Sequence, residues 1–130
     1  MATEPDNPPF GKIFWTDLTV PDAAQVRDFY SQVVGWKPEE VNMGGYSDYT
    51  MLIPGVGQPA AGICYARGSN ADLPAQWLVY ILVPDVEAAA ERCRSAGGKV
   101  IVGPREMGDG RFCVIQDPAG AVAALYANPK

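Results

Sequence analysis

One carboxylate stands in the middle of an otherwise apolar segment. Asp17 lies within Ile13–Val20, a β-rich run whose other residues are mostly apolar or aromatic. A carboxylate on such a strand is partly removed from water, which raises its pKa and suits it to act as a general base. The alternative is a structural carboxylate that is paired with Arg105 or Arg111 or hydrogen-bonded to a tyrosine. The sequence supports both interpretations.

The chain has no histidine and three cysteines, and this restricts its chemistry. A Cys–His nucleophile is excluded, so Cys113 is interpreted as a core residue. A divalent metal would need carboxylates alone, and few acidic residues fall on the expected strands, so we expect no metal and no cofactor. The odd cysteine count, without paired spacing or an apolar N-terminal segment, favours reduced thiols in the cytoplasm.

Composition excludes several classes of protein. The 130 residues are 48% hydrophobic and 19% charged, which is typical of one globular domain. The net charge of −5, with scattered Lys and Arg, argues against a nucleic-acid partner because phosphate needs a basic face. No apolar run reaches the roughly 20 residues of a membrane span, so no membrane partner is expected.

The elements that must position Asp17 occur twice along the chain. Val20-Pro21-Asp22 returns as Val83-Pro84-Asp85, and each tripeptide separates an expected strand from a helix that ends at glycine. In the first helix Val26, Phe29, Tyr30 and Val33 share one face, which we expect to be buried. The expected strands are Ile13–Val20, Lys37–Asn42, Tyr49–Ile53 and Ala61–Ala66, then Gln76–Val83, Lys99–Val102, Arg111–Gln116 and Ala121–Ala127, with the second helix at Asp85–Ala96.

This order predicts an α+β fold built from two βαβββ modules. We expect a flexible tail over residues 1–10, a first module over 11–67, a linker over 68–75 and a second module over 76–130. One module cannot cover both faces of its sheet. Two modules that share a curved mixed sheet therefore form the economical solution.

Four motifs carry a resemblance to a known family. They are Asp17-Leu-Thr-Val-Pro-Asp22, Asp28-Phe-Tyr-Ser-Gln-Val-Val-Gly-Trp36, the repeat from Val83-Pro-Asp85 through Gly97-Gly98, and Asp117-Pro-Ala-Gly120. In this order the chain resembles the vicinal oxygen chelate superfamily, which includes glyoxalase I, bleomycin-resistance proteins and extradiol dioxygenases. The resemblance covers nearly all of the chain after Phe10 and implies that the two modules form a cup.

The resemblance also locates the positions of the family's metal ligands. In metal-binding members, His or Glu residues from four strands converge inside the cup. Here the corresponding positions hold Trp15, Ile63, Leu78 and Ala124, none of which suits a divalent cation. The resemblance therefore implies a variant without metal.

Strand alternation, phased on these positions, predicts an apolar and aromatic lining for the cup. Arg105 lies in Gly103–Gly110, a loop that borders the cup in the family and whose arginine could meet an anionic group. Alternatively, the aromatic side chains fill the cup as core, and the loop is an ordinary solvated one. The expected ligand-binding residues are Trp15, Thr19, Ile63, Tyr65, Leu78, Tyr80, Arg105, Ala124 and Tyr126, with Asp17 as the candidate catalytic base.

Three functions are compatible with this pattern. The first is metal-free binding of a small aromatic or hydrophobic organic molecule in the cup, as bleomycin-resistance relatives bind without chemistry. The second is a metal-independent isomerase or lyase with Asp17 as base. The third is a structural or regulatory module with a filled cup. We expect the chain to form a homodimer.

Overall fold

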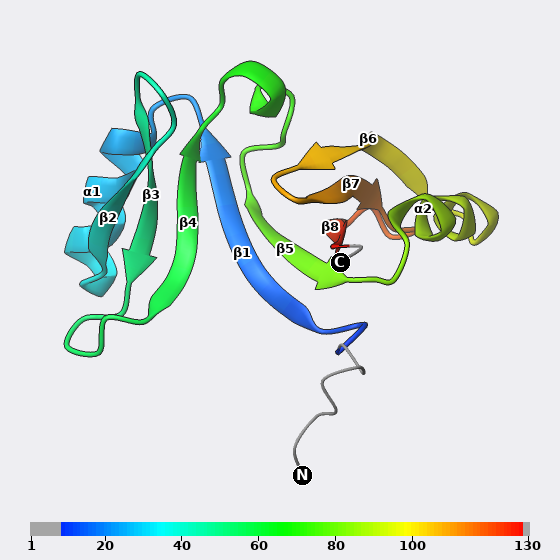
Figure 1. The fold of residues 1–130 in the computed structure, drawn as a ribbon, viewed down its shortest axis with the longest axis horizontal. Helices are drawn as coiled ribbons and strands as arrows, with labels where there is room; N and C mark the ends of the chain where they lie inside the picture. The colour runs from blue at the N-terminus through cyan, green and yellow to red at the C-terminus, as the bar shows by residue number, and fades with distance from the viewer. Residues whose placement is uncertain (1–8, 129–130) are drawn as a thin grey trace, which may run out of the picture. The chain divides into compact units, whose positions relative to one another are not determined.

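A computed structural model describes residues 9–128, apart from the side chain of Ser69. The expected tail over 1–10 lies outside the described residues except for Pro9 and Phe10. The chain divides into two compact units (Figure 1). The α1 unit comprises Thr16–Trp77, and the α2 unit comprises the residues up to Trp15 together with those from Leu78 onward.

The elements follow the order βαβββ twice (Figure 1). This confirms the α+β class and the repeated module predicted from the sequence. The elements are β1 (Ile13–Val20), α1 (Ala23–Val34), β2 (Lys37–Asn42), β3 (Ser47–Leu52), β4 (Pro59–Tyr65), a 3-10 turn η1 (Gly68–Asn70), β5 (Trp77–Leu82), α2 (Val86–Ser95), β6 (Lys99–Met107), β7 (Gly110–Gln116) and β8 (Val122–Ala127).

The strands are mixed in direction within each unit. The order is β2-β3-β4-β1 in the α1 unit and β5-β8-β7-β6 in the α2 unit. The β1–β4 and β5–β8 pairs are parallel, and the β2–β3, β3–β4, β6–β7 and β7–β8 pairs are antiparallel.

Strand β1 belongs to both units. Its first residues, up to Trp15, group with the α2 unit, and its remainder belongs to the α1 unit. Just before β1, Gly11 N donates to Leu82 O at 2.7 Å, and Leu82 N donates to Lys12 O at 2.9 Å. The α2 unit is therefore built from two segments that lie far apart in the sequence.

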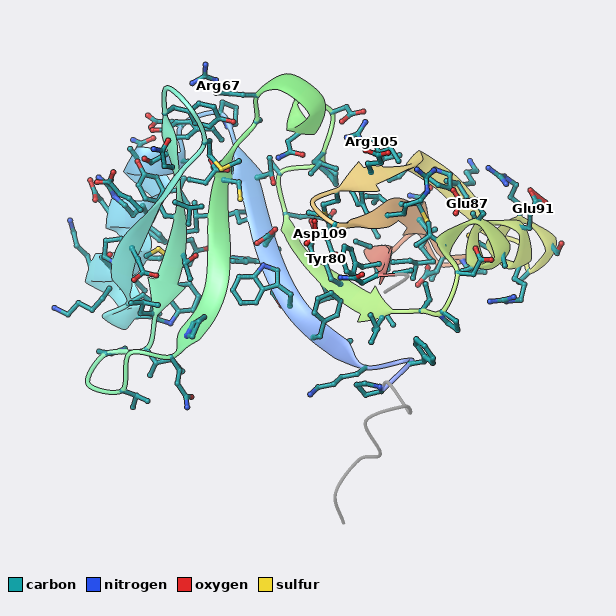
Figure 2. All side chains as sticks on the ribbon, viewed as in Figure 1. Arg67, Tyr80, Glu87, Glu91, Arg105 and Asp109 are labelled. Atoms are coloured by element: carbon teal, nitrogen blue, oxygen red, sulfur yellow. The ribbon has the colours of Figure 1, made fainter. Side chains whose placement is uncertain are left out.

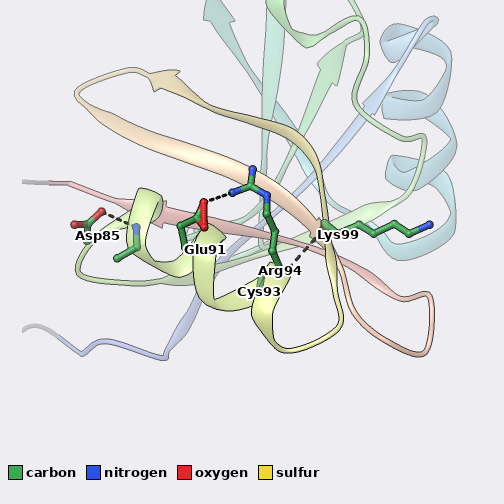
Figure 3. Close-up of polar contacts among 6 residues, drawn as sticks. Asp85, Glu91, Cys93, Arg94 and Lys99 are labelled. Atoms are coloured by element: carbon green, nitrogen blue, oxygen red, sulfur yellow. Dashed lines mark hydrogen bonds and ion pairs between the residues drawn. The ribbon is translucent and has the colours of Figure 1, made fainter.

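Both helices begin where the Pro-Asp pattern predicts. Asp22 accepts a hydrogen bond from Gln25 N at 3.1 Å, and Asp85 accepts one from Ala88 N at 3.1 Å (Figure 3). Each carboxylate thereby satisfies a backbone donor that has no partner inside its helix. Gly35 ends α1 with a φ of 79°, the left-handed conformation expected of a C-terminal glycine.

Each helix packs on one face of its own sheet. In the α2 unit, Val86, Ala89 and Ala90 pack against Cys113, Leu125 and Ala127. In the α1 unit, Ala23 packs with Tyr49, Met51 and Ile63. Val26 and Tyr30 also pack against this core, whereas Phe29 and Val33, which were expected on the buried face, are 55% and 61% exposed. We call the sheet face turned away from the helix the distal face of that unit. Neither helix among the described residues is long and apolar enough to cross a membrane.

Candidate functional site

The distal face of the α2 unit is lined by aromatic and aliphatic side chains. Leu125 and Ala127 pack toward α2, so strand alternation directs Ala124 and Tyr126 to the distal face. Tyr80 lies opposite Ala124, and Phe112 lies opposite Tyr126, on that same face. The phase predicted for β5 and β8 is therefore confirmed.

Three rings form a cluster on this face, which we call the aromatic cluster: Phe14, Tyr80 and Tyr126. The centroids of Phe14 and Tyr126 are 5.6 Å apart, and those of Phe14 and Tyr80 are 6.5 Å apart at an interplanar angle of 68°. Tyr80 is 2% exposed, whereas Phe14 is 41% exposed. The cluster thus has a buried base and an accessible ring. Sequence reasoning missed Phe14, although an aromatic side chain beside Trp15 was a visible signal.

The side chain of Tyr126 packs closely against Gly110. A Cβ atom at Gly110 would lie 2.5 Å from the Tyr126 hydroxyl and 2.6 Å from Cζ, and it would collide with the carbonyl of Ala127. A glycine inside a strand often marks such a close approach. The tyrosine ring can therefore lie directly over the β7 backbone.

Arg105 is on a strand and not in the expected Gly103–Gly110 loop. Strand β6 continues to Met107. The Gly103-Pro104 pair that suggested a loop is accommodated within the strand by shifts in the β6–β7 register at Val100/Val102 and Val102/Arg105. The Arg105 guanidinium carbon lies 5.4 Å from the centroid of the Phe112 ring, opposite it in the sheet. Figure 2 shows Arg105 and Tyr80 in the α2 unit, from β6 and β5 respectively. A cation is thereby fixed on the same face as the aromatic residues.

Arg111, one of the two arginines considered as a partner for Asp17, forms an ion pair with Glu87. Its Nε and Nη2 donate to Glu87 Oε2 at 2.7 and 2.6 Å. This ion pair lies at the start of α2, beside a hollow of about 190 Å³ that both residues line.

The distal face of the α1 unit is polar where that of the α2 unit is aromatic. Asp17 lies opposite Gly62, and Thr19 lies opposite Cys64. Asp17 is 9% exposed and Asp48 is 6% exposed. The predicted burial of Asp17 is therefore confirmed, and a second buried carboxylate, Asp48, accompanies it in this unit.

Asp48 and Cys64 form a hydrogen-bonded pair. Burial, followed by the charges of Asp17 and Asp48, raises the pKa of the Cys64 thiol far above its ordinary value, and the thiol donates a hydrogen bond to Asp48. Asp48 Oδ1 also accepts from Tyr65 N at 2.9 Å. Cys64 is therefore a protonated donor and not a nucleophile.

The expected phase of β4 is wrong. Ile63 is in the core cluster beneath α1, and Tyr65 packs against that cluster, so neither faces the distal side. The error comes from aligning Ile63–Ala66 with Ala124–Ala127 on their shared Tyr-Ala. The hydrogen-bond register instead makes Gly62 the counterpart of Ala124, and a slip of one residue exchanges the two faces of a strand. Tyr65 instead lies near Tyr46 and Tyr49, at centroid distances of 5.9 and 6.3 Å.

The corrected phase does not restore a metal site. The four positions become Trp15, Gly62, Leu78 and Ala124, whose side chains contain no suitable donor. Within residues 9–128, no three His, Cys, Asp or Glu side chains are grouped so that they could hold a metal ion. The residues present therefore do not fit the divalent metal of metal-binding relatives.

Known proteins resemble this chain over most of its length. The chain is 36% identical over 124 residues to the anthracycline biosynthesis protein DnrV of Streptomyces peucetius, covering 86% of this chain and 45% of that protein. It therefore spans about half the length of this relative. It is 29% identical over 126 residues to a probable lactoylglutathione lyase of Vibrio parahaemolyticus, covering 91% of each.

The fold is also found among solved structures. Methylmalonyl-CoA epimerase of Streptomyces coelicolor matches with a TM-score of 0.54 and 18% identity, covering 93% of this chain and 99% of that one. The family model described as Glyoxalase/Bleomycin resistance protein/Dioxygenase superfamily matches residues 12–125. The repeated module, the strand order and this match agree that the chain belongs to the glyoxalase/bleomycin resistance protein/dioxygenase superfamily.

Proposed function

We propose that this protein binds a planar aromatic organic molecule at the aromatic cluster of the α2 unit, without a metal. The observation that carries the proposal is the accessible Phe14 ring, which rests on Tyr80 and Tyr126. Buried contacts already fix the side chains at the base of the cluster. Ligand binding therefore costs little conformational entropy in ordering them. A flat ring system can then stack or pack edge-on against Phe14.

Two neighbouring features define the ligand further. Leu78 and Ala124 are buried residues of the same face and supply an apolar floor. Arg105, above Phe112, offers charged donors to a carbonyl, phenolate or carboxylate oxygen on the ligand. A polycyclic aromatic compound with oxygen substituents combines these properties.

One of the relatives supports the same class of ligand. It is named for anthracycline biosynthesis, and anthracyclines are oxygenated fused-ring compounds. That relative is about twice as long as this chain. A ligand shared by the two proteins is therefore part of our proposal.

We expect Phe14→Ala to weaken the binding of a soluble planar probe, anthraquinone-2-sulfonate, about tenfold, because it removes the accessible ring of the cluster. The measurement is a titration followed by protein fluorescence and by calorimetry. Phe10→Ala is the matched control, since Phe10 is 50% exposed and is not part of the cluster. Equal affinity in wild type and Phe14→Ala, or no saturable binding by wild type, overturns the proposal.

A second candidate function rests on the α1 unit. Asp17 is a buried carboxylate on the face that also holds Thr19. This arrangement supports a metal-independent isomerase or lyase in which Asp17 removes a proton from carbon.

For this candidate we expect slow deuterium exchange into carbon acids in D₂O, followed by NMR over a panel of oxygenated aromatic ketones. Asp17→Asn should abolish the exchange because the amide is not a base, while leaving the far-UV spectrum unchanged. Exchange that is retained in Asp17→Asn contradicts the assignment of the base.

A further inference from the structure

One row of side chains crosses the distal face of the α2 unit. Arg105 on β6 lies opposite Phe112 on β7, and Phe112 lies opposite Tyr126 on β8. Residues directly opposite one another in antiparallel strands have their side chains on the same face. Phe14 continues the row, since its ring centroid lies 5.6 Å from that of Tyr126. A cation and three rings therefore follow one another across the strands.

The cation at one end of this row is held in place. The guanidinium carbon of Arg105 lies 5.4 Å from the centroid of the Phe112 ring, and Phe112 is 2% exposed. Arg105 itself is half-buried, so solvent screens its charge less than that of a fully exposed arginine. A guanidinium that rests on a ring still has five N–H donors, whose fork fits two oxygens of a carboxylate or sulfonate.

Acidic neighbours in the chain lie on the other face. Glu106 lies opposite Arg111, so strand alternation turns both away from the face that holds Arg105. Glu106 and Asp109 line a hollow of about 340 Å³ together with Arg111. Arg111 also pairs with Glu87 of α2, which confirms that its side chain is on the helix side of the sheet.

The accessible ring at the other end of the row is Phe14, which is 41% exposed. It approaches Tyr126 from the side of β5, because it also contacts Tyr80, with centroids 6.5 Å apart. The strands that hold Tyr126 and Arg105 are two strand spacings apart, about 10 Å. A single ring stacked on Phe14 does not reach Arg105, whereas three linearly fused rings with a substituent at the far end do.

We propose that this row sets both the length of the ligand and the position of its charge, an inference that rests on the proposed function. The site takes linear fused-ring compounds of at least three rings that carry an anionic group at one end of their long axis. The uncharged end lies against Phe14, and the anionic group binds the guanidinium of Arg105. Arg105 is thus a specificity-determining residue, because an isomer with its charge on the long edge cannot make both contacts.

Two isomers of one probe test this inference by calorimetric titration. Anthraquinone-2-sulfonate carries its charge toward the end of the long axis, and anthraquinone-1-sulfonate carries it on the long edge. We expect wild type to bind the 2-isomer about tenfold more tightly, the effect of one charge-assisted contact. Arg105→Gln should remove this preference by weakening the 2-isomer alone, and Arg105→Lys, which keeps the charge but not the fork, should retain part of it.

Arg111→Gln is the matched control. It removes the same charge from the neighbouring strand, but on the helix side, so the preference for the 2-isomer should be unchanged. Equal binding of the two isomers by wild type, or a preference that survives in Arg105→Gln, overturns this inference and leaves the proposed function standing. Absence of saturable binding of either isomer overturns both.

The length of the ligand is tested with naphthalene-2-sulfonate, which has the same anionic group on two fused rings. Because it cannot reach Arg105 from Phe14, we expect its affinity to be the same in wild type and Arg105→Gln. A loss in Arg105→Gln as large as that of anthraquinone-2-sulfonate overturns the requirement for three rings. The melting temperature of each variant, measured without ligand, shows that the comparison is made between folded proteins.

Discussion

Gly110→Ala should lower the free energy of unfolding by about 2–3 kcal/mol, the cost of forcing an extra carbon into a packed site. The added Cβ would collide with the carbonyl of Ala127 and with the ring of Tyr126. The carbonyl belongs to the paired strand β8 and cannot move alone, so the strands must separate locally or the tyrosine must leave. Denaturation in urea measures the loss of stability.

The same substitution should reduce ligand binding, because Tyr126 supports Phe14 in the aromatic cluster. Gly44→Ala is the control. Gly44 has a φ of 84°, which favours glycine, whereas Gly110 has no positive φ. No atom lies within 4 Å of the Gly44 Cβ position, so we expect Gly44→Ala to cost about 1 kcal/mol and to leave binding unaltered. Stability of Gly110→Ala within 0.5 kcal/mol of wild type would contradict the close approach.

Asp48→Ala should cost about 2–4 kcal/mol because it leaves two partly buried donors unsatisfied. They are the amide of Tyr65, 2.9 Å from Oδ1, and the thiol of Cys64. Asp48→Asn keeps an acceptor at this position and should cost distinctly less. Urea denaturation of the two variants gives the comparison, and equal losses would show that packing, and not hydrogen bonding, accounts for the effect.

The thiol supplies a second readout for the same pair. The carboxylate of Asp48 is one of the groups that raise the pKa of Cys64, so Asp48→Asn should lower that pKa, although burial, the largest cause, still holds it above the ordinary value. Reaction of native protein with a thiol reagent should therefore begin at lower pH in Asp48→Asn. Cys64→Ser in the Asp48→Asn background identifies which thiol reacts.

The sequence predicts most of the fold because its signals are local and repeated. The carboxylates of Asp22 and Asp85 cap the two helices where the Pro-Asp pattern places them, and Gly35 adopts the left-handed conformation that ends α1. These are properties of a few neighbouring residues. Because the module is repeated, a helix or strand predicted in one half can be checked against its counterpart in the other half.

The site is harder to predict because it depends on strand phase and on contacts between distant residues. Residues 61–65 of β4 are apolar or aromatic except for a cysteine, so hydrophobicity does not distinguish its two faces. Only the register with Asp17 and Thr19 assigns Ile63 to the α1 side. The packing of Tyr126 over Gly110 and the accessible ring of Phe14 follow from strand pairing, which no local pattern encodes.

The division of β1 between the two units has a consequence for synthesis on the ribosome. Residues 16–77 emerge in one continuous stretch, so the α1 unit can fold while the rest of the chain is still being made. The α2 unit combines residues made before that stretch with residues made after it, so its two parts are joined across the whole sequence of the α1 unit. The aromatic cluster, with Phe14 from the first of these segments and Tyr126 from the second, is therefore assembled only after the α1 unit has been synthesised.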